Sequence, residues 1–213
     1  SPTRKRRVRE VLDLVGLDPK LYGSRRPRQL SGGQCQRVAI ARAIALNPSL
    51  LICDEAVSSL DVLIQAQVLN LFEELRRELG LSYLFIAHDL ALVKQVSDRV
   101  AVMYLGKLCE VGPGDEVYRE PLHPYTRALL DSIPSAEPGA RRAGATLKGE
   151  PPSPVSPPSG CRFRTRCPRV QDRCAQQEPL PRELSPGHVV ACHFPLQDKA
   201  RPVSDEKGSG ITV

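Results

Sequence analysis

Residues 30–61 read LSGGQCQRVAIARAIALNPSLLICDEAVSSLD, and this stretch decides the fold that we expect. Ser31 stands before two glycines and a run of good helix formers at residues 34–46, which Asn47 and Pro48 bring to an end. A continuous apolar run at residues 50–53 follows, as in a buried strand. The stretch therefore predicts a loop, a helix that begins at the serine, and a strand.

A second apolar run, at residues 81–87, predicts the partner of this strand. Apolar residues between the two runs recur at helical spacing: Val68, Leu71, Phe72, Leu75 and Leu79. Strand, helix and strand in this order predict a parallel α/β sheet. Polar pairs follow each strand, Asp54-Glu55 and His88-Asp89, at the edge where open α/β sheets bind ligands. We expect the two strand ends to converge on one site.

The rest of the chain divides by composition. Residues 4–15 and 124–130 predict helices, and residues 100–105 and 107–111 predict a short strand pair. We expect an α/β core at residues 1–133, followed by a linker at 134–159, which holds seven prolines. A cysteine-containing extension at 160–195 and a disordered polar tail at 196–213 complete the expected organisation.

Two motifs have residue types that suit phosphate chemistry. Ser31 with Gly32 and Gly33 at a helix start offers a hydroxyl, close backbone approach and a favourable dipole for an anion. Asp54 and Glu55 suit phosphoryl transfer, which needs a neutralising metal and an oriented nucleophile. Each motif also has a purely structural interpretation, an ordinary N-cap for the first and a turn after a strand for the second.

Taken in order, these motifs resemble the signature, Walker B, D-loop and switch histidine of an ABC-type ATPase, a P-loop NTPase that works as a dimer. The resemblance implies that Asp54 holds Mg²⁺ through water, that Glu55 polarises the attacking water, and that His88 senses the γ-phosphate. Residues implied to contact the nucleotide of the opposite subunit, or to communicate across the dimer, are Ser31, Gly32, Gly33, Gln34 and Asp61. Ala56 and Cys53 depart from the usual pattern without removing a ligand.

The sequence contains no G-x-x-x-x-G-K-[ST] loop, which cradles the phosphates in such enzymes. In the family this loop, the glutamine loop and the adenine-stacking aromatic all precede the signature. We therefore expect the chain to be the C-terminal part of a longer ATPase, a partial domain that cannot turn over ATP alone.

Residues 54–68, residues 123–130 and the cysteine region together resemble the ATPases of dipeptide and oligopeptide permeases. The resemblance implies a peripheral subunit on the cytoplasmic face of the bacterial membrane. Its implied partners are a second ATPase, two membrane permease subunits and, indirectly, an extracytoplasmic peptide-binding protein. Alternatives are import of nickel or another solute, a non-catalytic regulatory or metal-sensing protein, and a soluble ABC protein of DNA repair or translation.

Four cysteines cluster in the extension: Cys161, Cys167, Cys174 and Cys192. Four thiolates can hold a [4Fe–4S] cluster or a tetrahedral Zn²⁺ ion. The spacing lacks the C-x₂-C pairs of zinc ribbons, and the Cys-Pro step resembles ferredoxin ligands. The resemblance to the peptide-permease ATPases implies the cluster, which is therefore favoured. Zinc, with His188 or His193 as substitute ligands, and unligated or disulfide-forming thiols remain open. Cys35, Cys53 and Cys109 are solitary in the sequence.

Composition excludes several other classes of protein. A net charge of +6 with 4% aromatic residues and no stacking motif argues against nucleic-acid binding. No apolar stretch approaches the ~20 residues that a membrane span needs, so we expect neither an anchor nor a signal peptide.

Overall fold

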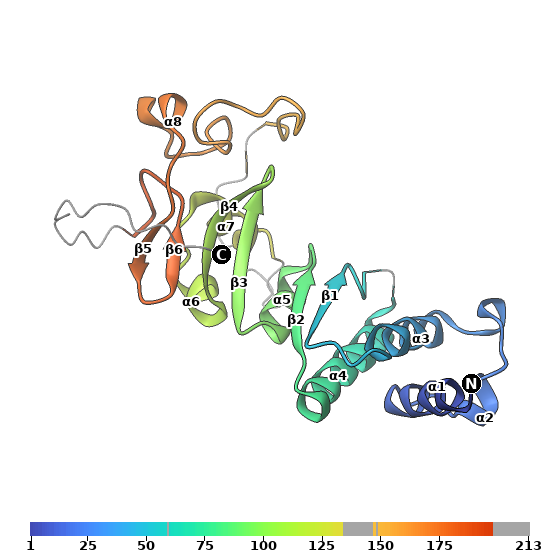
Figure 1. The fold of residues 1–213 in the computed structure, drawn as a ribbon. Helices are drawn as coiled ribbons and strands as arrows, with labels where there is room; N and C mark the ends of the chain where they lie inside the picture. The colour runs from blue at the N-terminus through green and yellow to red at the C-terminus, as the bar shows by residue number, and fades with distance from the viewer. Residues whose placement is uncertain (59, 134–146, 148, 198–213) are drawn as a thin grey trace, which may run out of the picture. The chain divides into compact units, whose positions relative to one another are not determined.

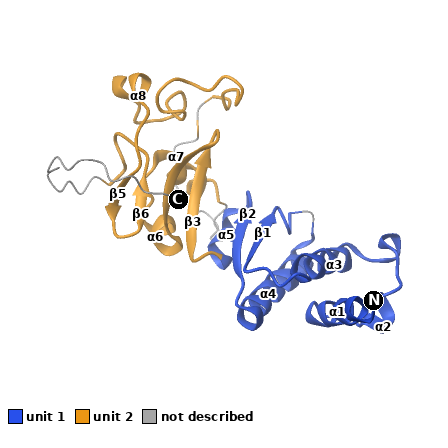
Figure 2. Cartoon of the chain, viewed as in Figure 1, with its two compact units in different colours: residues 1–96 blue, residues 97–213 orange. Residues whose placement is uncertain are grey.

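The computed structural model describes residues 1–58, 60–133, 147 and 149–197, which divide into two compact units with the boundary between residues 96 and 97 of the sequence (Figures 1 and 2). Most of the expected linker and nearly all of the expected tail lie outside the described residues. The domain boundaries that the sequence predicts therefore stay a prediction.

The first unit begins with helices and ends with a strand, helix and strand. Its helical part contains α1 (Pro2–Leu14), α2 (Pro19–Tyr22), a 3₁₀ turn (Pro27–Gln29) and α3 (Gly32–Ile44). The rest is β1 (Leu50–Asp54), α4 (Val62–Leu79), β2 (Ser82–Ile86) and α5 (Leu90–Val96). β1 and β2 pair in parallel, which confirms the predicted α/β arrangement.

One face of the β1–β2 sheet packs on α4. The rings of Phe72 and Phe85 meet edge to face at 5.1 Å, and the Tyr83 hydroxyl donates to the Phe72 carbonyl at 3.1 Å. Apolar side chains of α1 and α3 join the same core; Val15 and Ile44 are fully buried in it. This packing fixes the two strands against α4 and so positions the residues that follow them.

The opposite face of the same sheet is exposed and apolar. The exposed fractions are 51% for Leu50, 61% for Ile52, 51% for Leu84 and 48% for Ile86. Ile52 and Leu84 are register partners, so these side chains form one continuous surface. Parallel sheets are normally buried on both faces. The apolar side chains of this exposed surface are those of a buried sheet face.

The second unit is built on a four-stranded antiparallel sheet in the order β3-β4-β6-β5. Its strands are β3 (Arg99–Tyr104), β4 (Lys107–Pro113), β5 (Arg182–Ser185) and β6 (His188–Val190). Its helices are α6 (Gly114–Arg119), α7 (Pro124–Asp131) and α8 (Asp172–Gln176). The β3–β4 pair was predicted from the sequence, whereas the β5–β6 hairpin was missed.

A buried contact between His188 and Glu110 joins this hairpin to β4. Nε2 of His188 lies 2.7 Å from Oε1 of Glu110, and Nδ1 of the same ring lies 3.4 Å from Oε2 of Glu116. Glu110 also accepts hydrogen bonds from the backbone N–H groups of Leu122 and His123. A buried carboxylate needs such partners, so these contacts fix β6 and the start of α7 on one strand.

Candidate functional site

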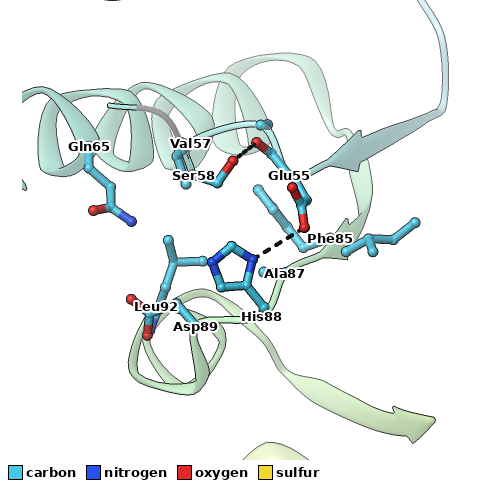
Figure 3. Close-up of a pocket in the computed structure, with 11 residues that line it drawn as sticks. Glu55, Val57, Ser58, Gln65, Phe85, Ala87, His88, Asp89 and Leu92 are labelled. Carbon is cyan, nitrogen blue, oxygen red and sulfur yellow. Dashed lines mark hydrogen bonds and ion pairs between the residues drawn. The ribbon is translucent and has the colours of Figure 1, made fainter. Parts of the chain in front are cut away.

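The ends of β1 and β2 meet, as the sequence predicts, in a pocket of the first unit (Figure 3). Glu55 continues β1 by one residue, because its N–H donates to the Ile86 carbonyl of β2 at 2.9 Å. His88 follows β2, and its Nδ1 lies 3.2 Å from Oε1 of Glu55. Both side chains are more than half exposed, at 72% for His88 and 56% for Glu55. The pair is therefore open to a solute.

The backbone of Glu55 has an unusual conformation. Its φ is +46°, in the left-handed region that residues other than glycine rarely adopt. The Ser58 hydroxyl donates to the Glu55 carbonyl at 3.0 Å and holds the turn that follows. Non-glycine residues in this region cluster at functional sites, where the surrounding structure holds them in place.

Neighbouring residues complete the pocket. Oδ1 of Asp89 accepts hydrogen bonds from the N–H groups of Ala91 and Leu92, so this carboxylate caps the start of α5. Gln65 of α4 and Phe85 also line the pocket, and the sequence interpretation did not single out either one. The sequence pattern around Gln65 predicted only a helix, and the pattern around Phe85 predicted only a strand.

The serine and glycines of the signature stretch lie at the start of α3. Oγ of Ser31 accepts a hydrogen bond from the Gln34 N–H at 3.3 Å, and Oε1 of Gln34 accepts one from the Ser31 N–H at 3.0 Å. This reciprocal pair is a capping box. The N-cap interpretation of Ser31 is confirmed, and both side chains remain near the exposed helix start, where an anion is favoured.

The close approach of α4 gives a structural reason for a glycine at position 33. A Cβ atom at this position would lie 2.7 Å from Cγ2 of Ile64 in the first turn of α4. Asp61 caps that same turn, since its Oδ1 accepts a hydrogen bond from the Ile64 N–H at 3.0 Å. The starts of α3 and α4 therefore lie together.

The predicted site residues thus form two groups within the described residues. Glu55 and His88 line the pocket at the strand ends. Ser31, Gly32, Gly33, Gln34 and Asp61 lie at the starts of α3 and α4 and are not among the residues that line it. Asp54 is exposed at the end of β1, next to Glu55.

The seven cysteines all lie within the described residues and all are free thiols. Cys161 and Cys167 pack against a buried cluster formed by Tyr104, Cys109 and Phe163. Burial and then the neighbouring Cys167, Cys161 and Cys174 raise the pKa of Cys192 to about 12. The four cysteines of the extension are therefore close in space.

Backbone groups point at three of these sulfur atoms. Burial raises the pKa of each thiol, and a hydrogen bond from the backbone two residues later opposes that rise. The pairs are Cys161 with Phe163, Cys167 with Arg169, and Cys192 with Phe194. Among the described residues, no group of three or more His, Cys, Asp or Glu side chains is placed to hold a metal ion.

Two details of this region differ from the sequence interpretation. Cys109, solitary in the sequence, is buried beside the cysteine cluster, and burial together with Cys161 raises its pKa to about 12. The ring of His188 contacts the carboxylates of Glu110 and Glu116, and Nε2 of His193 hydrogen-bonds the Gln177 carbonyl at 2.9 Å. Both histidines therefore have protein partners.

Within the described residues, no helix is both long and apolar enough to cross a membrane.

Comparison with known proteins yields two family matches. The model of the ABC transporter family matches residues 3–58, and that of the oligopeptide/dipeptide transporter C-terminal region matches residues 109–174. The second match includes three of the four clustered cysteines.

Several curated proteins are similar over nearly the whole chain. The oligopeptide transport ATP-binding protein OppF of Salmonella typhimurium is 56% identical over 87% of this chain and 56% of its own length. OppF of Escherichia coli is 55% identical over 88% and 56%, and AppF of Bacillus subtilis is 54% identical over 90% and 58%. The chain spans little more than half the length of these relatives. A solved ATP-binding cassette, MJ1267 in its ADP conformation, aligns with a TM-score of 0.49 at 28% identity, over 55% of this chain and 46% of that one.

Proposed function

This chain belongs to the ABC transporter ATP-binding proteins of the oligopeptide type, and from that premise we propose that it serves an importer of di- or oligopeptides by hydrolysing ATP. The observation that carries the proposal is the exposed Glu55–His88 pair at the converging ends of β1 and β2. A positioned carboxylate can act as a general base toward a water molecule, and the imidazole beside it can hold it in place.

Each residue of the pocket has a role in this proposal. Glu55 would orient the attacking water, and His88 would hold the Glu55 carboxylate and contact the γ-phosphate. Asp54 is exposed at the strand end next to Glu55 and suits Mg²⁺, which prefers oxygen ligands and keeps several waters. Bound there through water, the ion would neutralise charge on the phosphates.

The second group of residues would act on another nucleotide. Ser31, Gly32, Gly33 and Gln34 lie at an exposed helix start, outside the pocket lined by Glu55. We propose that they face ATP bound to a second ATPase subunit, with Asp61 beside the same interface. The separation of the two groups within one chain supports a dimeric arrangement.

A longer polypeptide would supply the missing phosphate loop. The relatives are nearly twice as long as the matched region, and the apolar face of β1 and β2 has the composition of an interior. We propose that further residues of the ATPase domain cover this face, and that the 213-residue chain alone does not turn over ATP.

The substrate and the partners follow from the relatives. Proteins 54–56% identical are named for oligopeptide transport, so we propose a peptide as the transported solute. The proposed assembly contains a second ATPase and two membrane permease subunits at the cytoplasmic face of the membrane. An extracytoplasmic binding protein would deliver the peptide.

We also propose that the four clustered cysteines hold a [4Fe–4S] cluster. Four thiolates are the ligand set that such a cluster needs, and three of these cysteines fall within the match to the oligopeptide/dipeptide transporter C-terminal region. The backbone hydrogen bonds to three of the sulfurs suit this role, because such bonds stabilise cluster ligands.

A chimera tests the transport proposal. The N-terminal part of E. coli OppF, up to the start of its match, is placed before Ser1 and expressed in a strain without its own OppF. We expect uptake of a labelled tripeptide to be restored by the chimera and lost in its Glu55→Gln variant, with Glu74→Gln as the matched control on exposed α4. Peptide uptake that survives Glu55→Gln would contradict the proposal.

A further inference from the structure

The first 30 residues carry all of the net charge of the chain. They contain nine Lys or Arg residues and three Asp or Glu residues, which gives a net charge of +6, the value for the whole chain. The other 183 residues are balanced, with 21 residues of each sign. Residues 1–30 hold α1, α2 and the 3₁₀ turn, and α1 and α2 lie at the end of the first unit away from β1 and β2 (Figure 1). One end of this unit is therefore strongly positive.

The basic side chains at this positive end are open to solvent. Eight of the nine belong to exposed residues. The exception is the half-buried Arg7, whose guanidinium donates to the carbonyls of Ile44 and Ala45, each at 3.0 Å. Arg7 thus joins α1 to the end of α3, whereas the exposed basic residues are available to a partner.

Acidic residues neutralise little of this charge. Oε1 of Glu10 lies 3.4 Å from Nε of Arg6, and both side chains are exposed. Within the part of the chain that the structure describes, no ion pair joins Arg4, Lys5 or Arg9 to an acidic side chain. Lys5 and Arg9 stand four residues apart on α1, where like charges repel each other. An anionic partner would remove this repulsion.

Two exposed apolar side chains lie among these charges. Val8 of α1 is 48% exposed and Leu21 of α2 is 59% exposed. Lys and Arg beside exposed apolar side chains are the composition of helices that bind at a membrane surface. Single-stranded nucleic acids bind by stacking on aromatic rings, and the one ring of residues 1–30, that of Tyr22, lies under the guanidinium of Arg25 at 4.9 Å. The composition therefore favours a lipid surface.

We propose that this positive end of the first unit, residues 1–30, binds the anionic headgroups of a lipid membrane. The inference rests on the proposed place of the protein at the membrane and adds a lipid partner to it. Headgroup phosphates are many and mobile, so they can follow exposed Lys and Arg side chains that the fold does not hold in one geometry. Clusters of four to eight such residues bind anionic lipids.

The strength of the contact follows from the number of charges. Each Lys or Arg near an anionic surface strengthens binding by about fivefold, so the loss of three weakens it by about a hundredfold. Salt should weaken the binding as well, because it screens exposed charges. Leu21 contributes through its apolar surface, and Leu21→Gln should weaken binding by about fivefold.

The experiment measures sedimentation of the full chain with lipid vesicles. One set contains equal parts of phosphatidylglycerol and phosphatidylcholine, and the other contains phosphatidylcholine alone. We expect binding only to the anionic set. The triple variant Arg4→Gln, Lys5→Gln and Arg9→Gln should bind about a hundredfold more weakly. Glutamine keeps the helix propensity of Lys and Arg, so the urea unfolding midpoint should match that of the wild type.

A second triple variant is the matched control. Arg77→Gln, Arg119→Gln and Arg173→Gln remove the same charge from exposed positions outside residues 1–30, and vesicle binding should stay close to that of the wild type. No binding to the anionic vesicles, or equal losses in the two triple variants, would overturn the inference.

A short DNA duplex tests the other kind of anionic partner. Leu21→Gln should weaken binding to vesicles and leave any binding to DNA unchanged. DNA binding tighter than vesicle binding, with no effect of Leu21→Gln on either, would identify a nucleic-acid surface and overturn the lipid inference. Vesicle binding needs neither nucleotide nor permease, so its failure leaves the transport proposal intact. A chimera that restores no peptide uptake would overturn the transport proposal and leave the measured lipid binding in place.

Discussion

Nδ1 of His88 lies 3.2 Å from Oε1 of Glu55, and the two residues stand two positions and one position, respectively, beyond the ends of two paired parallel strands. The pairing of Asp54 with Ile86 brings the strand ends into register, so the contact follows from the sheet itself. Because both side chains are largely exposed, the pair contributes little to stability. Its value lies in the orientation of the carboxylate.

The first prediction concerns this pair. In the chimera with OppF, Glu55→Gln and His88→Ala should each reduce ATP hydrolysis by about 10²–10⁴-fold, the usual contribution of a positioned acid or base. The midpoint of urea unfolding should change little, because exposed substitutions usually stay within about 0.5 kcal/mol. Hydrolysis is measured by phosphate release. Equal losses in Glu74→Gln would show that the effect is not specific to the site.

The second prediction concerns the start of α3. Gly33→Ala gains about 1 kcal/mol of helix propensity, but its methyl group meets Ile64 at 2.7 Å, which costs about 1–3 kcal/mol. In an Ile64→Ala background the clash is gone, and the same substitution should stabilise. Urea unfolding of the four proteins gives the coupling energy, expected to exceed about 1 kcal/mol. Gly32→Ala, whose Cβ would meet only Leu60 at 3.9 Å, should show no such coupling to Ile64.

The third prediction concerns acid stability. Burial lowers the pKa of His123 from its ordinary 6.5 to about 4, and the neutral ring accepts a hydrogen bond from the Tyr125 N–H. Between pH 6.5 and 4 the unfolded chain binds a proton that the folded chain does not. Stability should therefore fall on acidification through this range, by about 3 kcal/mol in total.

The variant His123→Asn isolates this effect, because asparagine keeps an N-cap acceptor for α7 and does not titrate. The free energy of unfolding is measured from pH 7 to pH 4 for both proteins. The difference between them should shrink as the pH falls. A difference that stays constant with pH would rule out His123 as the source.

The fourth prediction separates ligand from neighbour in the cysteine region. Cys167→Ser should remove most of the iron from protein purified without oxygen, because serine is a poor ligand for an iron–sulfur cluster. Cys109→Val should retain the iron, since Cys109 belongs to the packed core of β4. Iron and acid-labile sulfide are assayed per chain. Matching losses in the two variants would identify Cys109 as a ligand.

The fifth prediction concerns the exposed face of β1 and β2. Ile52→Asn should change the stability of the 213-residue chain by no more than about 0.5 kcal/mol, because the side chain is 61% exposed. In the chimera, where we propose that this face is covered, the same change should cost 2 kcal/mol or more. Leu46→Asn, at a position that is 91% exposed, serves as the control. Equal effects of Ile52→Asn in both proteins would argue against a covered face.

Much of the first unit could be predicted from local patterns. The spacing of apolar residues and the residues that end helices and strands predicted α3, β1, α4 and β2. The serine before two glycines predicted the N-cap of α3. The convergence of Glu55 and His88 followed from the strand–helix–strand order alone. The catalytic and nucleotide-contacting roles of these residues stay predictions.

The second unit was harder to anticipate because its decisive contacts are distant in sequence. Glu110 appeared as one more charged residue, and its partner His188 lies 78 residues further on. The strands β5 and β6 are only four and three residues long, too short for a clear alternation. The position of Cys109 beside the other thiols could not be predicted, because Cys109 is far from them in the sequence and only folding brings them together.

The left-handed backbone of Glu55 has a consequence for any attempt to engineer this protein. Glycine would fit that conformation with less strain, yet the position carries the side chain on which we expect the reaction to depend. Selection for thermal stability alone would therefore favour Glu55→Gly and yield a more stable protein without the proposed ATP hydrolysis. Thermal screens of this chain need a functional assay beside them from the first round.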